Sequence, residues 1–494
     1  MNLNPIRPAG RDAPPEGSRA PTEAAAPPAS APRSGAALAA LAGAQFMVML
    51  ATSIVNVALP QIRSGIGLSD AGTTWAVNAY GLAFGALLLA GGRASDLLGR
   101  RLVLLAGLAV FAASALATGL AASSSVLIVA RAVQGAGAAA IAPAALALVM
   151  GLFPPGPGRG RALGVWGAVS GAGGAAGVLL GGVLTDALGW RWIFFAVALG
   201  TVGVLAAVLV LAPRPEAGRT APGRFDYPGA VTVTFALTGL VWGLTTARRA
   251  GWGDQQVLAA FAGAAVLMVV FVLGERRHPD PLVPPRLFGT GRVAAGNVLM
   301  FLLGSVWIAL FFFLPLYQQQ VLGQSPLTTG LGQLPLAGCM MLGSALAPRL
   351  ATRIGPAVTA AVALLVAGAG MLWLANISTD GGYLGNVLGP SILIGLGLST
   401  AFVQLTVFSV DVPGPDAGLA GGLVNTTRQV GGAVGLAVLT TLAGSATARA
   451  ATHHSHLEAL TSGYRTAFAI SAALMAATAV LAVVLTRGSA RQTG

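Results

Sequence analysis

The sequence predicts an all-α polytopic membrane protein, and three observations lead to this fold class. Of its 494 residues, 55% are apolar and only 9% are charged. Soluble globular proteins carry about 25% charged residues, so this chain could not cover a water-facing surface. Its 69 glycines favour close helix–helix approach in lipid. Finally, its apolar windows are repeatedly long enough to cross a bilayer, which takes about 20 residues.

Fourteen apolar windows lie between charged or Pro/Gly-rich breaks, and each is expected to form one membrane-spanning helix. The expected spans are 36–60, 73–92, 102–121, 126–150, 162–185, 192–212, 228–247, 256–274, 293–317, 328–350, 356–375, 384–409, 417–444 and 466–486.

The charged residues predict the orientation of these spans. All 28 basic residues are arginine. Without lysine, the chain lacks the phosphate-binding residue of a P-loop and the amine for Schiff-base chemistry. The N-terminal tail and the loops on its side of the membrane hold twenty arginines, and the opposite side holds six. The positive-inside rule therefore predicts a plasma-membrane protein with both termini in the cytoplasm. Because the arginines are spread over short gaps, no nucleic-acid-binding patch is expected.

The expected domains follow from composition and from a weak internal repeat. Residues 1–34 are rich in proline and alanine and predict a disordered cytoplasmic tail. Gly92-Arg93-x-x-Asp96-x-x-Gly99 matches Pro348-Arg349-x-x-Thr352-x-x-Gly355 in the second half. Two like-built halves are typical of a rocking transporter. We expect a six-helix bundle at 35–212, a linker with two extra helices at 213–291, a second bundle at 292–487 and a tail at 488–494.

Five stretches carry motif-like patterns. They are Ser53-Ile54-Val55-Asn56-Val57-Ala58-Leu59-Pro60, Gly92-Arg93-Ala94-Ser95-Asp96-Leu97-Leu98-Gly99-Arg100-Arg101, Arg131-Ala132-Val133-Gln134-Gly135, Trp190-Arg191-Trp192-Ile193-Phe194-Phe195 and Asn425-Thr426-Thr427-Arg428-Gln429-Val430-Gly431-Gly432. Together they resemble the major facilitator superfamily, specifically its fourteen-span drug:proton antiporters. The resemblance covers residues 36–486 and implies two six-helix bundles joined by two extra spans.

The resemblance implies a cytoplasmic latch in the loop after the second span. Its members are Gly92, Arg93, Asp96, Gly99, Arg100 and Arg101. The alternative is a basic loop that only sets topology.

Two arginines fall inside spans, where a charge costs about 2.5–3.5 kcal/mol on insertion scales. By resemblance, Arg131 with Gln134 serves proton transfer or conformational coupling; the alternative is an arginine that snorkels to the interface. Arg428 lies near mid-membrane and predicts a cavity-lining or gating role; the alternative is a structural arginine bonded to backbone carbonyls. The other polar residues expected at this cavity are Asn56, Asn425 and Gln429.

The fifth span resembles the antiporter motif through four glycines, which predict a ridge for close packing. They are Gly164, Gly173, Gly177 and Gly181. Val178 stands where the motif has a proline, so the kink of that motif is not expected.

The first span departs from the family pattern because Ala51 occupies the place of its usual aspartate. No acid lies deep in a span; Asp96, Asp186 and Asp226 lie at span edges. An interior with arginines and no carboxylate favours anionic or neutral substrates over cations. His453, His454 and His456 predict a solvated outer loop, and neither a metal nor a cofactor is expected.

The resulting hypothesis is a monomeric secondary exporter of small amphipathic compounds, such as antibiotics, that works by alternating access. Proton antiport is implied by the resemblance only. The alternatives are an exporter of one metabolite, such as an amino acid or lipid-like product, and a non-coupled transporter or sensor. A membrane-embedded enzyme would need a catalytic set within a span, and the sequence offers none.

Overall fold

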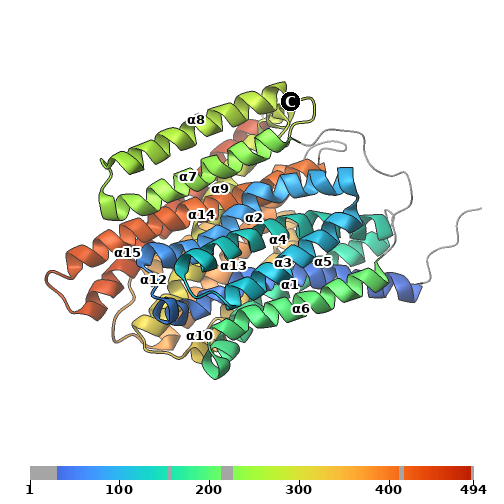
Figure 1. The fold of residues 1–494 in the computed structure, drawn as a ribbon. Coiled ribbons are helices and arrows are strands. Elements are labelled where there is room, and N and C mark those ends of the chain that lie inside the picture. Colours follow the sequence, from blue (N-terminus) through green and yellow to red (C-terminus); the bar gives the residue numbers. More distant parts are fainter. Residues whose placement is uncertain (1–30, 154–156, 213–225, 411–416, 491–494) are drawn as a thin grey trace, which may run out of the picture.

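A computed structural model describes residues 31–153, 157–212, 226–410 and 417–490. The described chain is helical, and fourteen of its segments are long and apolar enough to span a membrane, which confirms the predicted number. The helices run side by side along one common direction (Figure 1). Most of the predicted N-terminal tail, the end of the C-terminal tail and residues 213–225 of the linker lie outside the described residues.

The first eight spans are single helices. They are α1 (Ala31–Ile66), α2 (Asp70–Leu98), α3 (Arg100–Gly119), α4 (Ser124–Leu152), α5 (Pro157–Leu188), α6 (Arg191–Leu211), α7 (Tyr227–Ala250) and α8 (Gln255–Arg277). The 3-10 turn η1 (Pro285–Thr290) leads into the second half, which contains α9 (Arg292–Gln320), α10 (Pro326–Gly332), α11 (Leu334–Ile354), α12 (Pro356–Leu374), the π-helical turn η2 (Leu384–Leu388), α13 (Gly389–Val410), α14 (Ala417–Ala450) and α15 (His456–Ala490).

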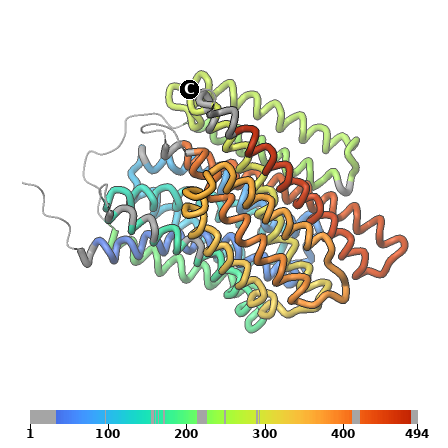
Figure 2. Tube along the Cα trace, turned by 180° about the vertical axis from the view of Figure 1, so that it is seen from behind, coloured from blue at the N-terminus to red at the C-terminus, as the bar shows by residue number. Residues whose placement is uncertain are grey.

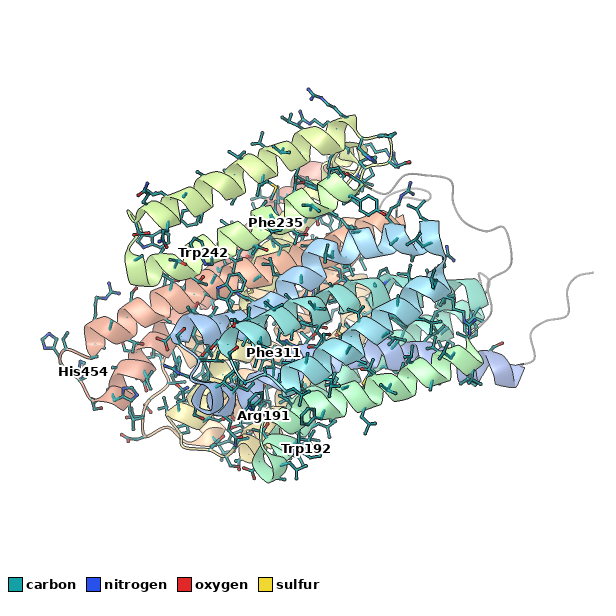
Figure 3. The ribbon with its side chains drawn as sticks, viewed as in Figure 1. Arg191, Trp192, Phe235, Trp242, Phe311 and His454 are labelled. Atoms are coloured by element: carbon teal, nitrogen blue, oxygen red, sulfur yellow. The ribbon has the colours of Figure 1, made fainter. Side chains whose placement is uncertain are left out.

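Several helix ends extend a few residues beyond the predicted spans, and two differences change the course of a span. The span expected at 328–350 is interrupted at Gln333, which divides it into α10 and α11. The last span begins at His456 rather than 466, because Glu458 and Arg465 continue the helix instead of ending it. The side chains of His453, His454 and His456 are exposed around the α14–α15 tip, where Figure 3 labels His454.

The repeat noticed in the sequence has a structural counterpart. Gly99 joins α2 to α3 and Gly355 joins α11 to α12, each as a single connecting residue. Their φ angles are 98° and 86°. Such positive φ values are accessible to glycine at little cost, so both halves use the same one-residue turn.

The extra pair of helices forms a hairpin at one edge of the molecule. Helix α7 packs on α2 and α14, whereas α8 packs on α7, and both views place the hairpin at the periphery (Figures 1 and 2). Only 11% of the apolar window of α8 is buried, and Figure 3 shows Phe235 and Trp242 on α7, both of which are exposed. In a membrane these apolar surfaces face lipid.

Candidate functional site

The glycines of the fifth span form the expected packing ridge. A Cβ on Gly173, Gly177 or Gly181 would collide with the backbone carbonyls of Phe46, Leu50 and Ile54, respectively. The spacing of four residues repeats on both helices, so α5 lies directly on the backbone of α1. Gly164 lies outside the residues whose side-chain positions are described.

Arg131 is fixed inside the N-terminal half. Its side chain is 1% exposed, and its guanidinium donates to the backbone carbonyl oxygens of Ala76 (3.2 Å) and Ala51 (3.3 Å). It also donates to Gln134 Oε1 at 2.8 Å and lies 4.4 Å from the centre of the Tyr80 ring. The arginine therefore joins α1, α2 and α4. Such contacts offset the cost of a buried charge, and snorkelling is wrong for this residue.

Arg428 has a different environment in the C-terminal half. Its guanidinium carbon lies 5.8 Å from the centre of the Trp307 ring and 5.6 Å from that of Phe402. Its Nη2 donates to Asn425 Oδ1 at 3.2 Å, and Nε has no hydrogen-bond partner. The Trp307 and Phe402 rings contact each other with centroids 5.6 Å apart. Trp307, Phe402 and Arg428 are each partly exposed, so a cation beside this aromatic pair remains accessible in α14.

The remaining predicted cavity residues divide between the surface and the interior. Asn425 is exposed beside Arg428, whereas Gln429 is 2% exposed and packs against Gly85 of α2. Asn56 is 5% exposed, and its Oδ1 has no hydrogen-bond partner. The structure therefore brings Asn425 and Arg428 together, and it does not bring Gln429 or Asn56 to them.

The arginines of the loop motif contact three different elements. Arg93 forms an ion pair with Asp280, which follows α8, at 3.1 Å. Arg100 donates to the Ala147 carbonyl near the end of α4, and Arg101 donates to that of Leu209 near the end of α6. Positive charge is favourable at helix C-termini. Asp96 belongs to α2, but its side chain lies outside the described positions.

The two halves meet through polar and glycine-mediated contacts. Gln319 of α9 donates to the Val57 carbonyl of α1 at 2.8 Å, and Asn78 of α2 donates to the Ala433 carbonyl of α14 at 3.1 Å. A Cβ on Gly182 of α5 would stand 2.6 Å from the Pro326 carbonyl oxygen. These three seams connect α1 to α9, α2 to α14 and α5 to α10.

Glu275 is a buried acid that the sequence did not single out. Glu275, near the end of α8, is 4% exposed, and Asp226, which caps the start of α7, is 2% exposed. Asp186 is exposed near the end of α5. An acid at the end of a long apolar window was the available signal, but the following Arg276 and Arg277 made Glu275 resemble part of a charged loop.

Comparison with known proteins identifies relatives and the fold. The model of the Major Facilitator Superfamily matches residues 41–436. The chain is 43% identical to the cephamycin export protein CmcT of Amycolatopsis lactamdurans, over 90% of each chain. It is 39% identical to the puromycin resistance protein pur8 of Streptomyces alboniger, over 95% of each chain.

Solved structures of low sequence identity share the fold. A POT family peptide transporter superposes with a TM-score of 0.69 at 15% identity, covering 92% of this chain and 97% of that one. A bacterial homologue of the lysosomal transporter Spinster, in an inward-facing conformation, gives 0.68 at 16% identity, covering 93% and 98%. This chain belongs to the Major Facilitator Superfamily and is one of its fourteen-helix transporters.

Proposed function

We propose that the protein is a secondary active exporter of small amphipathic antibiotics, which it drives out of the cell in exchange for protons. The identity of 43% to a cephamycin export protein over 90% of both chains is the observation that carries this proposal. A tetracenomycin C resistance and export protein of Streptomyces glaucescens, 37% identical over 83% of this chain and 76% of its own, supports it further.

Residues 35–212 and 292–487 are proposed as the two halves that rock about a midplane site, with residues 213–291 as their connection. Both termini are placed in the cytoplasm and the protein works as a monomer in the plasma membrane. The small glycine contacts between α5 and α10 suit rocking, since smooth surfaces can slide with little steric change.

Arg428, Trp307 and Phe402 are proposed as the core of the substrate site. An accessible guanidinium beside a pair of aromatic rings attracts a carboxylate or phenolate, while the rings contact an aromatic body. No carboxylate accompanies this arginine among the described side chains within hydrogen-bonding contact. Anionic or neutral aromatic compounds are therefore favoured over cations.

A second candidate function is the export of one particular metabolite rather than many drugs. The names of several relatives support it, because puromycin and tetracenomycin C each denote one compound and cephamycin denotes one class of antibiotic. A relative of 33% identity is named as a multidrug resistance protein, which supports the broader range.

Uptake into reconstituted vesicles under an imposed pH gradient tests the proposal. Anionic, neutral and cationic aromatic compounds of matched size are compared, with protein-free vesicles as control. We expect accumulation driven by the gradient and abolished by a protonophore, with the anionic or neutral compound favoured. Uptake that ignores the gradient would refute proton antiport, and uptake of none of the compounds would refute export.

A further inference from the structure

Two buried acids lie together in the peripheral hairpin, away from both intramembrane arginines. Glu275 is one of only three buried residues of α8, the others being Val257 and Ala264. Asp226 caps α7, and its Oδ1 accepts a hydrogen bond from the Gly229 amide at 2.8 Å. Their burial is notable on a hairpin whose surface is otherwise largely exposed to lipid.

The two carboxyl groups face each other. Glu275 Oε1 and Asp226 Oδ2 both lie against the point where a Cβ on Gly229 would stand, with Glu275 Oε1 2.8 Å from it. Glu275 Oε1 is buried and has no donor among the described residues. Because Gly229 has no side chain, both carboxyl oxygens fit beside this position.

The ionisable groups around the pair form no ion pair with it in the described part of the chain. Arg277 and His278 line the same cavity of about 300 Å³ as Asp226, at the end of α8. His278 Nδ1 accepts from the Asp280 amide, and Asp280 itself pairs with Arg93 of α2. In the described part of the chain, neither Asp226 nor Glu275 forms an ion pair.

Two carboxylates that are buried next to each other cannot both ionise without a large repulsion. A single proton held between them removes the repulsion and provides the missing hydrogen-bond donor. We propose that Asp226 and Glu275 form a proton-binding site, in which a proton carried by Glu275 is shared with the neighbouring Asp226 carboxyl group.

The site is connected to the segment that follows α8. We call residues 278–290 the strap. The Val283 amide of the strap donates to Glu275 Oε2 at 2.8 Å. Leu282 packs with Ala90 of α2 and Ala230 of α7. Glu275 therefore holds one end of the strap against the hairpin.

The strap also reaches both halves of the transporter. Leu287 packs with Val293 of α9 and Leu423 of α14, and Leu89 of α2 lies against the same cluster. Because α2 and α14 form one of the seams between the halves, the strap lies where rocking must change distances. Loss of the shared proton places two charges side by side and drives α8 from α7, which loosens the strap and its Asp280–Arg93 contact.

This site gives the proposed exporter a place to bind the exchanged proton, and that role rests on the proposed function. Whether the site holds a proton does not depend on the proposed function. The experiments below therefore use neither substrate nor transport, so their failure is distinguishable from failure of the proposed function.

Infrared difference spectroscopy of the full-length protein in lipid nanodiscs detects the shared proton. Spectra are taken from about pH 5 to about pH 9. The upper limit lies well above the ordinary pKa values of carboxyl groups. We expect a protonated-carboxyl band at pH 7 that changes in Glu275→Gln and in Asp226→Asn. Asp254→Asn is the matched control, because Asp254 caps α8 at the other end of the hairpin. A wild-type protein without such a band, or a band unchanged in both variants, would overturn the proposal.

Hydrogen exchange of the strap, corrected for the intrinsic effect of pH, tests the consequence. We expect the 278–287 amides of the wild type to exchange about tenfold faster or more once the pair is ionised, because the strap then opens locally. Glu275→Gln retains an acceptor for Val283 and is expected to stay protected at every pH. Glu275→Ala loses that acceptor and exchanges fast throughout. Strap protection that is independent of pH in the wild type contradicts the inference.

Discussion

The N-terminal and C-terminal halves each contain one arginine within a span, but the two arginines differ in what they contact and in how deeply they are buried. Arg131 is enclosed by hydrogen bonds to α1 and α4 and to the backbone of α2, with an aromatic ring on one face. Arg428 is partly exposed beside two rings that contact each other, with one amide as its hydrogen-bond acceptor. The comparison teaches that depth in a span does not define a role. We propose that the number of hydrogen bonds and the exposure of each arginine separate a structural Arg131 from an Arg428 that is available to a substrate.

The largest expected effect is on stability in the N-terminal half. Arg131→Ala removes a large buried side chain and leaves Gln134 Oε1 without its donor. Together these changes cost about 2–5 kcal/mol of the free energy of unfolding. Thermal unfolding in detergent, compared with Arg428→Ala, measures the difference. Equal losses of stability in the two variants would contradict a larger structural contribution of Arg131 than of Arg428.

A smaller loss of stability is expected at the α1–α5 interface, which positions the Ala51 carbonyl for Arg131. Gly177→Ala places a methyl carbon 2.7 Å from the Leu50 carbonyl oxygen. Overpacking of this kind costs about 1–3 kcal/mol of the free energy of unfolding. Gly174→Ala is the matched control, because nothing lies within 4 Å of its Cβ position. Unfolding temperatures that are the same for both variants would show that the interface is looser than described.

Arg428→Gln is expected to leave the unfolding temperature near that of the wild type but to lower uptake of an anionic aromatic compound. Loss of one charge-assisted contact, worth about 1.5–3 kcal/mol, predicts about a tenfold decrease or more. Initial rates in vesicles measure it. Arg428→Lys retains the charge but not the planar group that stacks on rings, so it should recover only part of the activity. Unchanged uptake of the anion by Arg428→Gln would show that Arg428 does not contribute to substrate binding.

Trp307→Leu is expected to give the smallest effect of the four. A leucine keeps an apolar contact but loses the aromatic face 5.8 Å from the guanidinium, an interaction worth about 0.5–1 kcal/mol at accessible sites. Uptake of an aromatic compound should fall a few-fold, while that of a non-aromatic anion changes less. Equal losses for both compounds would mean that the ring acts by packing alone.

Hydropathy was sufficient to predict the fold class and the number of spans, because each helix must satisfy its own backbone hydrogen bonds in lipid. The roles of the arginines were less predictable. Arg131 contacts Ala51, Ala76 and Tyr80, which are 80, 55 and 51 positions earlier in the chain. Local sequence patterns do not predict contacts over such separations.

The acid pair shows the same limit. Glu275 follows a long apolar window and precedes two arginines, which is the usual pattern of a span that ends in a charged loop. Its burial depends on the strap, whose Val283 amide folds back onto it, and on the tertiary contact between α7 and α8. The glycine ridge was predictable because its four-residue spacing is local, and the positions Gly173, Gly177 and Gly181 lie as expected.

The difference between the two arginine sites is tested most directly by cysteine accessibility during substrate binding. Cys339 is first replaced by alanine, and then Asn425, beside Arg428, or Gln134, beside Arg131, is changed to cysteine. We predict that a water-soluble thiol reagent labels the cysteine at 425 and that a transported anion protects it, whereas the cysteine at 134 stays unlabelled. Labelling at 134, or labelling at 425 that substrate does not affect, would contradict the assignment of Arg428 to the transport site.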